Sequence, residues 1–382
     1  MNVDRNNSNQ RLKEVALLFL KLGITSFGGP AAHIAMMKEE VVKKRQWIDE
    51  QHFLDLIGAT NLIPGPNSTE MAIHIGHERA GWKGLIVAGI CFIIPAVLIT
   101  GIFAVLYKEY GHLPTVQPFI YGISPAIIAI ILAAVYPLAK KSLKSVELGF
   151  LGIISFGLCL LGINEIYVMF GAGLIALALS YFRRGSSNNT LNSAFPLAFL
   201  PFSGTGPSNL SNLGIFLTFL KIGAILYGSG YVLFAFLDTE LVAKGLLSRQ
   251  QLVDAIAVGQ FTPGPVFSSV TFIGYQINYF TGALIATIGI FMPSFLFVAL
   301  LNPLVRAMRN SKPFSEFLDA VNVASIAIIA VICYQLGKET ISDWRTILIA
   351  ILSLTVVFGF RKINSALVVL GGSGLGFLLT LF

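Results

Sequence analysis

The chain has 382 residues, of which 55% are hydrophobic and 12% are charged, and its formal net charge is +7. A soluble chain carries about 25% charged residues, so this composition excludes a soluble enzyme, a nucleic-acid-binding module, a secreted disulfide scaffold and a disordered protein. The apolar residues form long runs, many of them close to the roughly 20 residues that cross a bilayer as a helix. We therefore expect an all-α polytopic membrane protein.

The first half starts with a polar tail at 1–11 and a short apolar run that Lys21 interrupts, without a signal-peptide cleavage pattern. Two short apolar runs then flank Pro64-Gly65-Pro66, and neither run is long enough to cross the bilayer alone. Longer apolar segments follow at 84–107, 116–139, 148–162 and 166–182. After a polar linker, the second half ends in apolar segments at 282–301, 317–337, 346–360 and 363–382.

The second half repeats the first. The pentapeptide Phe19–Gly23 recurs as Phe219–Gly223, and Pro64-Gly65-Pro66 recurs as Pro263-Gly264-Pro265. Between and after these motifs, Glu40, Asp55, Gly76, Gly84 and Pro95 are matched in order by Glu240, Asp254, Gly274, Gly282 and Pro293. Such an ordered series indicates a duplication. We expect a first transporter repeat at 1–182, a linker at 183–212 and a second repeat at 213–382.

The charges of the connections indicate that the repeats are inverted. Loop 78–83 contains Arg79 and Lys83, whereas the matching loop 276–281 has no charge, and the basic excess changes sides at each of the next three matched connections. Basic loops stay on the cytoplasmic side, so the halves face opposite ways, as in secondary transporters whose site lies near the midplane.

Inversion requires an odd number of crossings in each repeat. We expect about five membrane-spanning helices plus a re-entrant or broken helix at each PGP motif. This count places the N-terminus outside, although Arg5, Arg11 and Lys13 favour the cytoplasm. The alternative folds the first segment back at Gly28-Gly29-Pro30, so the side of the N-terminus stays open.

Each PGP motif predicts an anion site. Two prolines around a glycine break the helical ladder, and such a break persists at membrane depth only against protein or a watery cavity. The half-helix that begins near Asn67 or Val266 presents free N–H groups and its positive dipole end. The breaks Gly28-Gly29-Pro30 and Gly228-Ser229-Gly230 offer a second pair of openings. The alternative is a kink that serves only packing.

Matched polar residues lie beside the breaks. Lys21 and Lys221 each precede a glycine break by two helical turns and are candidates either to bind an anion or to extend to the headgroups. Asp55 and Asp254 precede the PGP motifs, where a buried carboxylate either pairs with a cation or carries a coupling proton. Asn61 and Gln260 are matched carboxamides able to donate to an oxyanion.

A different class of function is suggested by Glu70, His74 and His77, which share one helical face at metal-ligand spacing. The second half has no equivalent set and there is no HExxH motif, so a metal-dependent membrane enzyme is the alternative from another class. The single cysteines Cys91, Cys159 and Cys333 predict buried apolar side chains. We expect no metal, no cofactor and no catalytic residue.

Around its breaks the first half contains FGGPAAHI (27–34), LIPGPNSTEMAIHIGHERAGWKG (62–84) and FIIPA (92–96), and the second half contains AIAVGQFTPGPVFSSVTFIGY (255–275). These stretches resemble the chromate ion transporter family in its long, two-domain form. The resemblance implies that chromate, a tetrahedral dianion, is exported across the plasma (inner) membrane by the proton gradient or the membrane potential. It also implies that the FGGP and PGP segments line the pathway. The alternative within transport is a general sulfate or oxyanion carrier.

Together these observations predict an oxyanion at the repeat interface and alternating access between the repeats. The residues that we expect to bind substrate are Lys21, Gly28, Gly29, Pro30, Asn61, Pro64, Gly65, Pro66, Asn67, Lys221, Gly228, Gln260, Pro263, Gly264, Pro265 and Val266. Asp55, Glu70 and Asp254 are expected to balance charge or to take the coupling proton. The expected partners are the oxyanion and the lipid bilayer, with no nucleic acid and with a homodimer left open.

Overall fold

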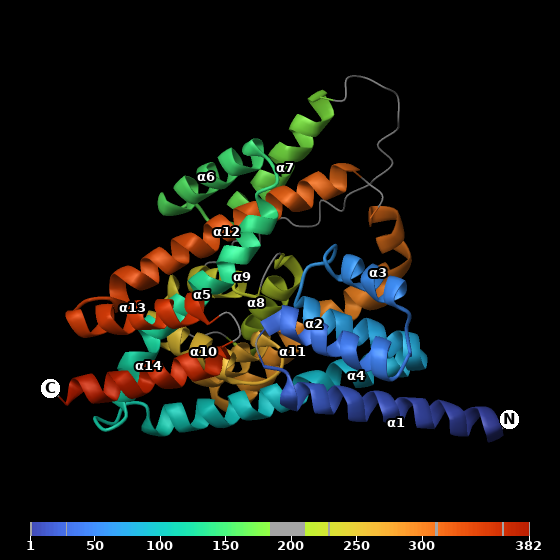
Figure 1. Ribbon diagram of the computed structural model, residues 1–382, viewed down its shortest axis with the longest axis horizontal. Coiled ribbons are helices and arrows are strands. Elements are labelled where there is room, and N and C mark those ends of the chain that lie inside the picture. Colours follow the sequence, from blue (N-terminus) through green and yellow to red (C-terminus); the bar gives the residue numbers. More distant parts are fainter. Residues whose placement is uncertain are drawn as a thin grey trace.

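The computed structural model describes residues 2–27, 29–183, 211–227, 230–309, 312–360 and 363–381, and every regular element in these ranges is a helix (Figure 1). The linker predicted at 183–212 lies almost wholly outside the described residues, as do Gly28 and Gly228. The prediction of an all-α chain is confirmed.

Apart from one 3₁₀ turn in the second repeat, the two repeats contain the same succession of elements. The first repeat consists of α1 (Asn2–Thr25), α2 (Gly29–Lys38), the π-helical turn η1 (Glu39–Lys44), α3 (Glu50–Thr60), α4 (Asn67–Tyr110), α5 (Gln117–Ser142), α6 (Val146–Leu160) and α7 (Glu165–Arg183). The second consists of α8 (Asn212–Ile225), α9 (Val232–Leu237), the π-helical turn η2 (Asp238–Val242), α10 (Arg249–Phe261), the 3₁₀ turn η3 (Val266–Ser268), α11 (Ser269–Arg309), α12 (Lys312–Thr340), α13 (Trp344–Gly359) and α14 (Ser365–Thr380).

Helix α4 doubles back on itself. Ala80 and Gly81 leave the helical conformation, with φ −140° and 62°. A Cβ placed on Gly76 would lie 2.4 Å from the carbonyl oxygen of Gly84 and 2.4 Å from the Cβ of Ala88. In a continuous helix such residues would stand roughly 12 to 18 Å apart, so α4 is a tight hairpin of a short arm and a long arm.

The same hairpin occurs in α11, where Asn278 and Tyr279 are non-helical and Gly274 packs against Gly282. Gly76 and Gly274 are the matched glycines of the sequence repeat. Because only glycine lets two helix backbones approach this closely, packing between the arms explains why both copies have glycine there.

Each PGP motif lies at the tip of a re-entrant pair of helices. The ring of His52, near the start of α3, lies 3.5 Å from the carboxylate of Glu78 at the end of the short arm of α4. The short arm therefore runs back beside α3, and Pro64-Gly65-Pro66 forms the turn between them. This agrees with the re-entrant segment that we expected because neither apolar run is long enough to cross the bilayer alone.

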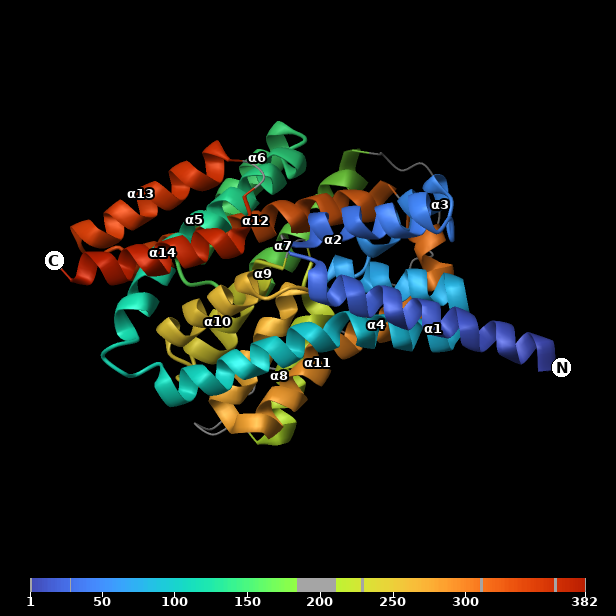
Figure 2. The ribbon, with the colours of Figure 1, turned by 60° about the horizontal axis from the view of Figure 1, so that its bottom comes forward.

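The repeats exchange their last helices. α13 and α14 pack against α5, whereas α6 and α7 pack against α12, as Figure 2 shows for α5, α13 and α14. Gly122 of α5 approaches Gly372 and Gly376 of α14 so closely that a Cβ on Gly122 would lie 2.0 Å from the carbonyl oxygen of Gly372. Small residues at such crossings let apolar helices pack closely in a membrane, so each repeat is completed by the other.

Contacts between the repeats place them in opposite orientations. Lys108, at the far end of the long arm of α4, donates to the carbonyl oxygen of Gln276 at 3.2 Å. Gln276 is the match of Glu78, which lies at the other end of that arm, roughly 40 Å away at about 1.5 Å per residue. A parallel second repeat would keep Gln276 level with Glu78, so this contact requires inversion.

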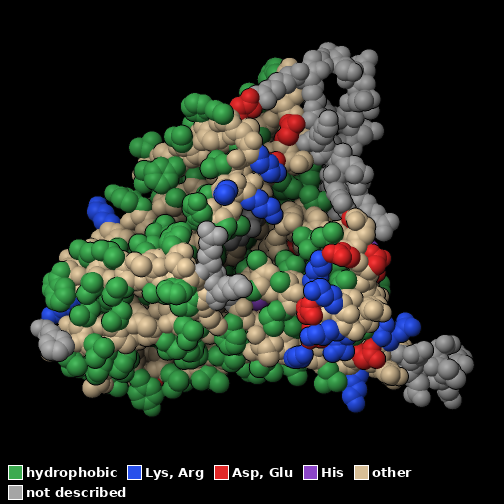
Figure 3. Space-filling view, viewed as in Figure 1, with side chains coloured by type: hydrophobic (Ala, Val, Ile, Leu, Met, Phe, Trp, Pro, Cys, Tyr) green, Lys and Arg blue, Asp and Glu red, His purple; other side chains and the backbone are tan. Residues whose placement is uncertain are grey.

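The outer surface fits a bilayer. Within the described part of the chain, four helical segments are long and apolar enough to cross a membrane, namely Asn67–Tyr110, Gln117–Ser142, Val266–Leu300 and Pro313–Thr340. Shorter apolar helices accompany them in both repeats. Hydrophobic side chains cover the flank around α6, α13 and α14 in Figure 3, whereas charged side chains gather over α2 and α3. Large exposed apolar patches mark contact with lipid or protein.

Candidate functional site

The four helix breaks meet in pairs across the two repeats. The backbone N–H of Gly65, in the first PGP motif, donates to the carbonyl oxygen of Leu226 at 2.8 Å. The N–H of Gly264, in the second motif, donates to the carbonyl oxygen of Ser26 at 2.8 Å. Ser26 and Leu226 are matched residues that directly follow α1 and α8. Each PGP motif is thus hydrogen-bonded to the backbone that directly follows the first helix of the opposite repeat.

A carboxyl side chain lies against the first PGP motif. Glu70 is completely buried, and its Oε1 accepts a hydrogen bond from Ser294 Oγ at 3.4 Å. A Cβ on Gly65 would lie 2.3 Å from Glu70 Oε1, so the carboxyl lies directly over that glycine. Gly65 also has a φ of 136°, a left-handed value that favours glycine.

Hydroxyl and amide side chains lie on either side of the second PGP motif instead. Ser268 and Ser269 are fully buried where η3 passes into α11, and Thr100 of α4 donates to Ser268 Oγ at 3.3 Å. Gln260 is 6% exposed and accepts from the Tyr231 hydroxyl at 3.4 Å. Among the described residues, neither Gln260 Nε2 nor Ser269 Oγ has a hydrogen-bond partner.

The matched carboxamides differ in their surroundings. Asn61 is exposed at the end of α3, and its side-chain oxygen accepts from Asn67 Nδ2 at 2.8 Å. Gln260 is buried at the corresponding end of α10. Pro64, Pro66, Pro263, Pro265 and Val266 are all buried, whereas Gly29 and Pro30 are half-buried at the start of α2.

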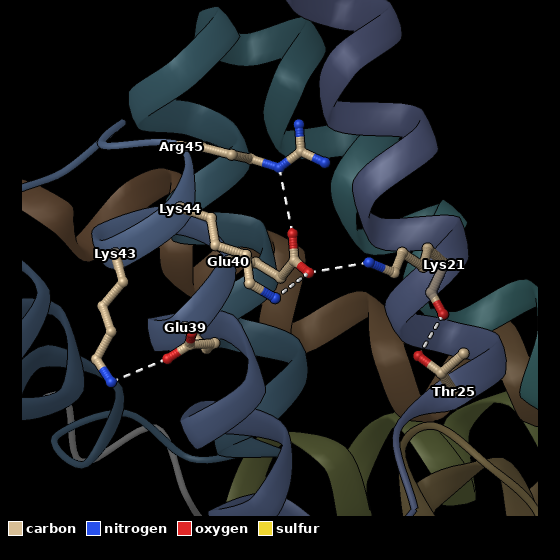
Figure 4. A network of polar contacts seen from close by, with 7 residues as sticks. All are labelled: Lys21, Thr25, Glu39, Glu40, Lys43, Lys44 and Arg45. Carbon is tan, nitrogen blue, oxygen red and sulfur yellow. Dashed lines mark hydrogen bonds and ion pairs between the residues drawn. The ribbon is translucent and has the colours of Figure 1, made fainter.

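Lys21 and Lys221 are ion-paired. Lys21 Nζ lies 2.9 Å from Glu40 Oε1, which also receives Lys44 at 3.3 Å, while Arg45 Nε lies 3.4 Å from Glu40 Oε2 (Figure 4). The hydrogen bond from Lys21 contributes most to holding the pKa of Glu40 below its usual value. Three cations thus share one carboxylate, which leaves an excess of positive charge beside the first break.

The second repeat reproduces this cluster. Lys221 and Lys244 each lie 2.6 Å from the carboxylate of Glu240. Burial of Glu240 opposes its ionisation, but the hydrogen bonds from the two lysines outweigh burial and keep its pKa below the usual value. The carboxylates Glu40 and Glu240 were recognised in the sequence only as matched positions, because their pairing with lysine depends on how the chain folds back after each glycine break.

The matched aspartates are hydrogen-bonded to neighbouring glutamines. Asp254 is 4% exposed and accepts from Tyr107 at 2.6 Å and from Gln250 at 3.1 Å. Asp55 is half-buried and accepts from Gln51 at 3.3 Å. Tyr107 comes from the opposite repeat, so its contact with Asp254 had no signal in the local sequence.

The alternative of a metal site receives no support. Among the described residues, no three His, Cys, Asp or Glu side chains are grouped so as to hold a metal ion. Instead, Glu70 contacts Ser294, and the neighbouring Glu78 contacts His52.

The chain is similar to known transport proteins along most of its length. A family model described as chromate transporter matches residues 13–177 and 213–377. The chromate transport protein of Cupriavidus metallidurans is 30% identical over 372 residues, which are 96% of this chain and 92% of that protein. The probable chromate transport protein of Synechococcus elongatus is 31% identical and covers 90% of this chain and 89% of its own length. No solved structure matches the chain.

Proposed function

Because the chain belongs to the chromate transporter family, we propose that it carries chromate across the membrane at the point where its four helix breaks meet. The chain is a multi-pass membrane transport protein and not an enzyme. The observation that carries the proposal is the pair of crossed hydrogen bonds, from Gly65 to Leu226 and from Gly264 to Ser26, which brings helix breaks of both repeats together.

The chemistry around the breaks suits a tetrahedral dianion. Helix N-termini and uncharged donors hold oxyanions well inside a protein. Asn61, Asn67 and Gln260, with the backbone after each PGP motif, supply such donors. The lysine clusters around Glu40 and Glu240 carry an excess of positive charge, through which Lys21 and Lys221 would attract the anion toward the breaks.

Alternating access is supported by unequal exposure of matched residues. The side chain of Lys21 is 56% exposed and that of Lys221 only 28%. Asn61 is exposed whereas Gln260 is buried. Both matched positions are thus more exposed in the first repeat than in the second. If the inverted repeats exchanged conformations, the accessible side would change to the opposite face of the membrane.

We further propose that the carboxyl groups of Asp55, Glu70 and Asp254 balance charge or carry a coupling proton. Glu70 and Asp254 are buried without an ion pair among the described residues, and a buried ionisable group in a membrane protein is expected to be functional. The driving force is then the proton gradient or the membrane potential, the direction is export, and the location is the plasma membrane.

The test is radiolabelled chromate flux in proteoliposomes, with a pH gradient and a potential imposed separately and protein-free liposomes as the control. Saturable chromate flux that excess sulfate barely reduces supports the proposal, and the gradient that drives it identifies the coupling. Sulfate competition together with sulfate flux would assign a general oxyanion carrier instead. Lack of flux of either ion by well-folded protein would contradict both assignments.

A further inference from the structure

The two PGP motifs are chemically different at matched positions. Glu70 stands four residues after Pro66, and Ser269 stands four residues after Pro265. The residue that hydrogen-bonds Glu70 is Ser294, whose match in the first repeat is Ala96. A Cβ on Gly65 would meet Glu70 and Ser294, and a Cβ on Gly264 would meet Ala96 at 3.0 Å. The repeats therefore share one backbone arrangement with two sets of side chains.

The first motif supplies its own acceptor. Glu70 Oε1 is paired with Ser294, and its buried Oε2 has no partner among the described residues. The side-chain oxygen of Asn61 accepts a hydrogen bond from Asn67 Nδ2, which uses one amide donor of the first motif. The buried Thr69 hydroxyl is unpartnered, but it shares this break with the carboxyl group. While Glu70 is ionised, an incoming oxyanion, which only accepts hydrogen bonds, would face an acceptor and a like charge here.

The second motif has unpaired donors and, among the described residues at the position that matches Glu70, a serine in place of a carboxyl group. The Nε2 of Gln260 and the Oγ of Ser269 are buried and unpartnered in the part of the chain that the structure describes. A Cβ on Gly259 would lie 3.0 Å from the Cβ of Ser269 and 3.3 Å from the carbonyl oxygen of Val266. The end of α10 therefore packs against the start of α11, so the two residues with free donors belong to one helix junction. Buried donors are normally satisfied, so two together point to a ligand rich in acceptors.

We propose that the transported dianion binds at the second PGP motif only, held by Gln260 and Ser269, while Glu70 fills the corresponding position of the first motif as a built-in acceptor. The proposal rests on the proposed function. It narrows the position of the bound anion from the meeting point of the four breaks to the PGP motif of the second repeat.

The test is equilibrium binding of radiolabelled chromate to the full chain in lipid nanodiscs. Ser269→Ala and Gln260→Leu should each weaken binding about tenfold to a hundredfold, the effect of one hydrogen bond to a charged group. Ser155→Ala is the matched control, because Ser155 is an equally buried serine on α6, away from the breaks.

A second variant transplants the first motif into the second. Ser269→Glu combined with Ala96→Ser gives the second motif the same pair of side chains, a carboxyl group and its hydroxyl donor, that Glu70 and Ser294 form at the first motif. This double variant should remain folded and lose chromate binding.

Wild-type affinity in Ser269→Ala and Gln260→Leu, or chromate binding by the double variant, would overturn the inference and leave the proposed function standing. Failure of the wild-type protein itself to bind chromate would refute the proposed function and this inference with it.

Discussion

Replacing Lys221 by methionine removes one of the two cations that neutralise a buried carboxylate. The Glu240 side chain is 8% exposed, and Lys221 and Lys244 each lie 2.6 Å from it. Removing one partner of a buried ion pair costs about 3–5 kcal/mol when the remaining charge is left uncompensated. Because Lys244 remains, we expect a smaller loss of stability, about 2 kcal/mol.

The matched variant Lys21→Met should cost much less. The Lys21 side chain is 56% exposed, and Glu40 keeps Lys44 and Arg45 after the change. Exposed ion pairs contribute about 0–1 kcal/mol, so Lys21→Met should remain within that range.

The two variants are compared by thermal unfolding of the purified chain in one detergent, and the readout is the fraction of the protein that stays monodisperse at each temperature. Lys221→Met should lower the midpoint by several degrees and Lys21→Met by about a degree at most. Equal losses, or a larger loss for Lys21→Met, would refute the burial argument. Wild-type chromate flux in folded Lys221→Met protein would also remove this lysine from the substrate pathway.

Three further outcomes are expected, the first measured as the yield of folded protein and the other two by thermal unfolding. Gly76→Ala should sharply reduce the yield of folded protein, because its Cβ would lie 2.4 Å from a facing carbonyl oxygen, whereas Gly101→Ala, with open space around it, should be tolerated. Asp254→Ala should cost about 1–3 kcal/mol by leaving buried donors unpaired, and Asp55→Ala, at the half-buried match, should cost less. The folded state lowers the pKa of Glu240, so its ionised carboxylate stabilises the fold at a pH above the ordinary glutamate pKa, and this stabilisation is lost as the pH falls through the lowered pKa. Glu240→Gln should therefore be less stable than wild type at neutral pH and should lose less stability on acidification.

The duplication, the breaks and the inversion were predictable because each depends on local composition. Proline and glycine break helices wherever they occur, and loop charge follows topology. The turn after Glu78 was also visible as a short charged connection. For the glycine-rich run at 371–376, the structure supplies Gly122 as the close partner of Gly372 and Gly376.

Contacts between the repeats were not predictable from a single sequence. The bond from Gly65 to Leu226 and the contact from Tyr107 to Asp254 join positions that no local pattern connects. The pairing of Lys21 with Glu40 spans a helix break whose geometry decides which side chains meet. The exchange of α13 and α14 onto α5 likewise depends on packing across the whole molecule.

The difference between the two PGP motifs could be read only with the structure. The sequence shows that Ser269 matches Glu70, but not that the carboxyl group lies over Gly65 beside Ser294. Whether Gln260 has a hydrogen-bond partner depends on neighbours from distant segments. Satisfaction of buried polar groups is a property of the packed fold.

The most direct measurement is an anomalous difference map at the chromium absorption edge, from crystals of the full chain grown with chromate. Our account predicts a chromium peak between the repeats, beside Gln260 and Ser269 at the second PGP motif. A peak confined to the lysine cluster around Glu40, or beside Glu70 at the first motif, would contradict it.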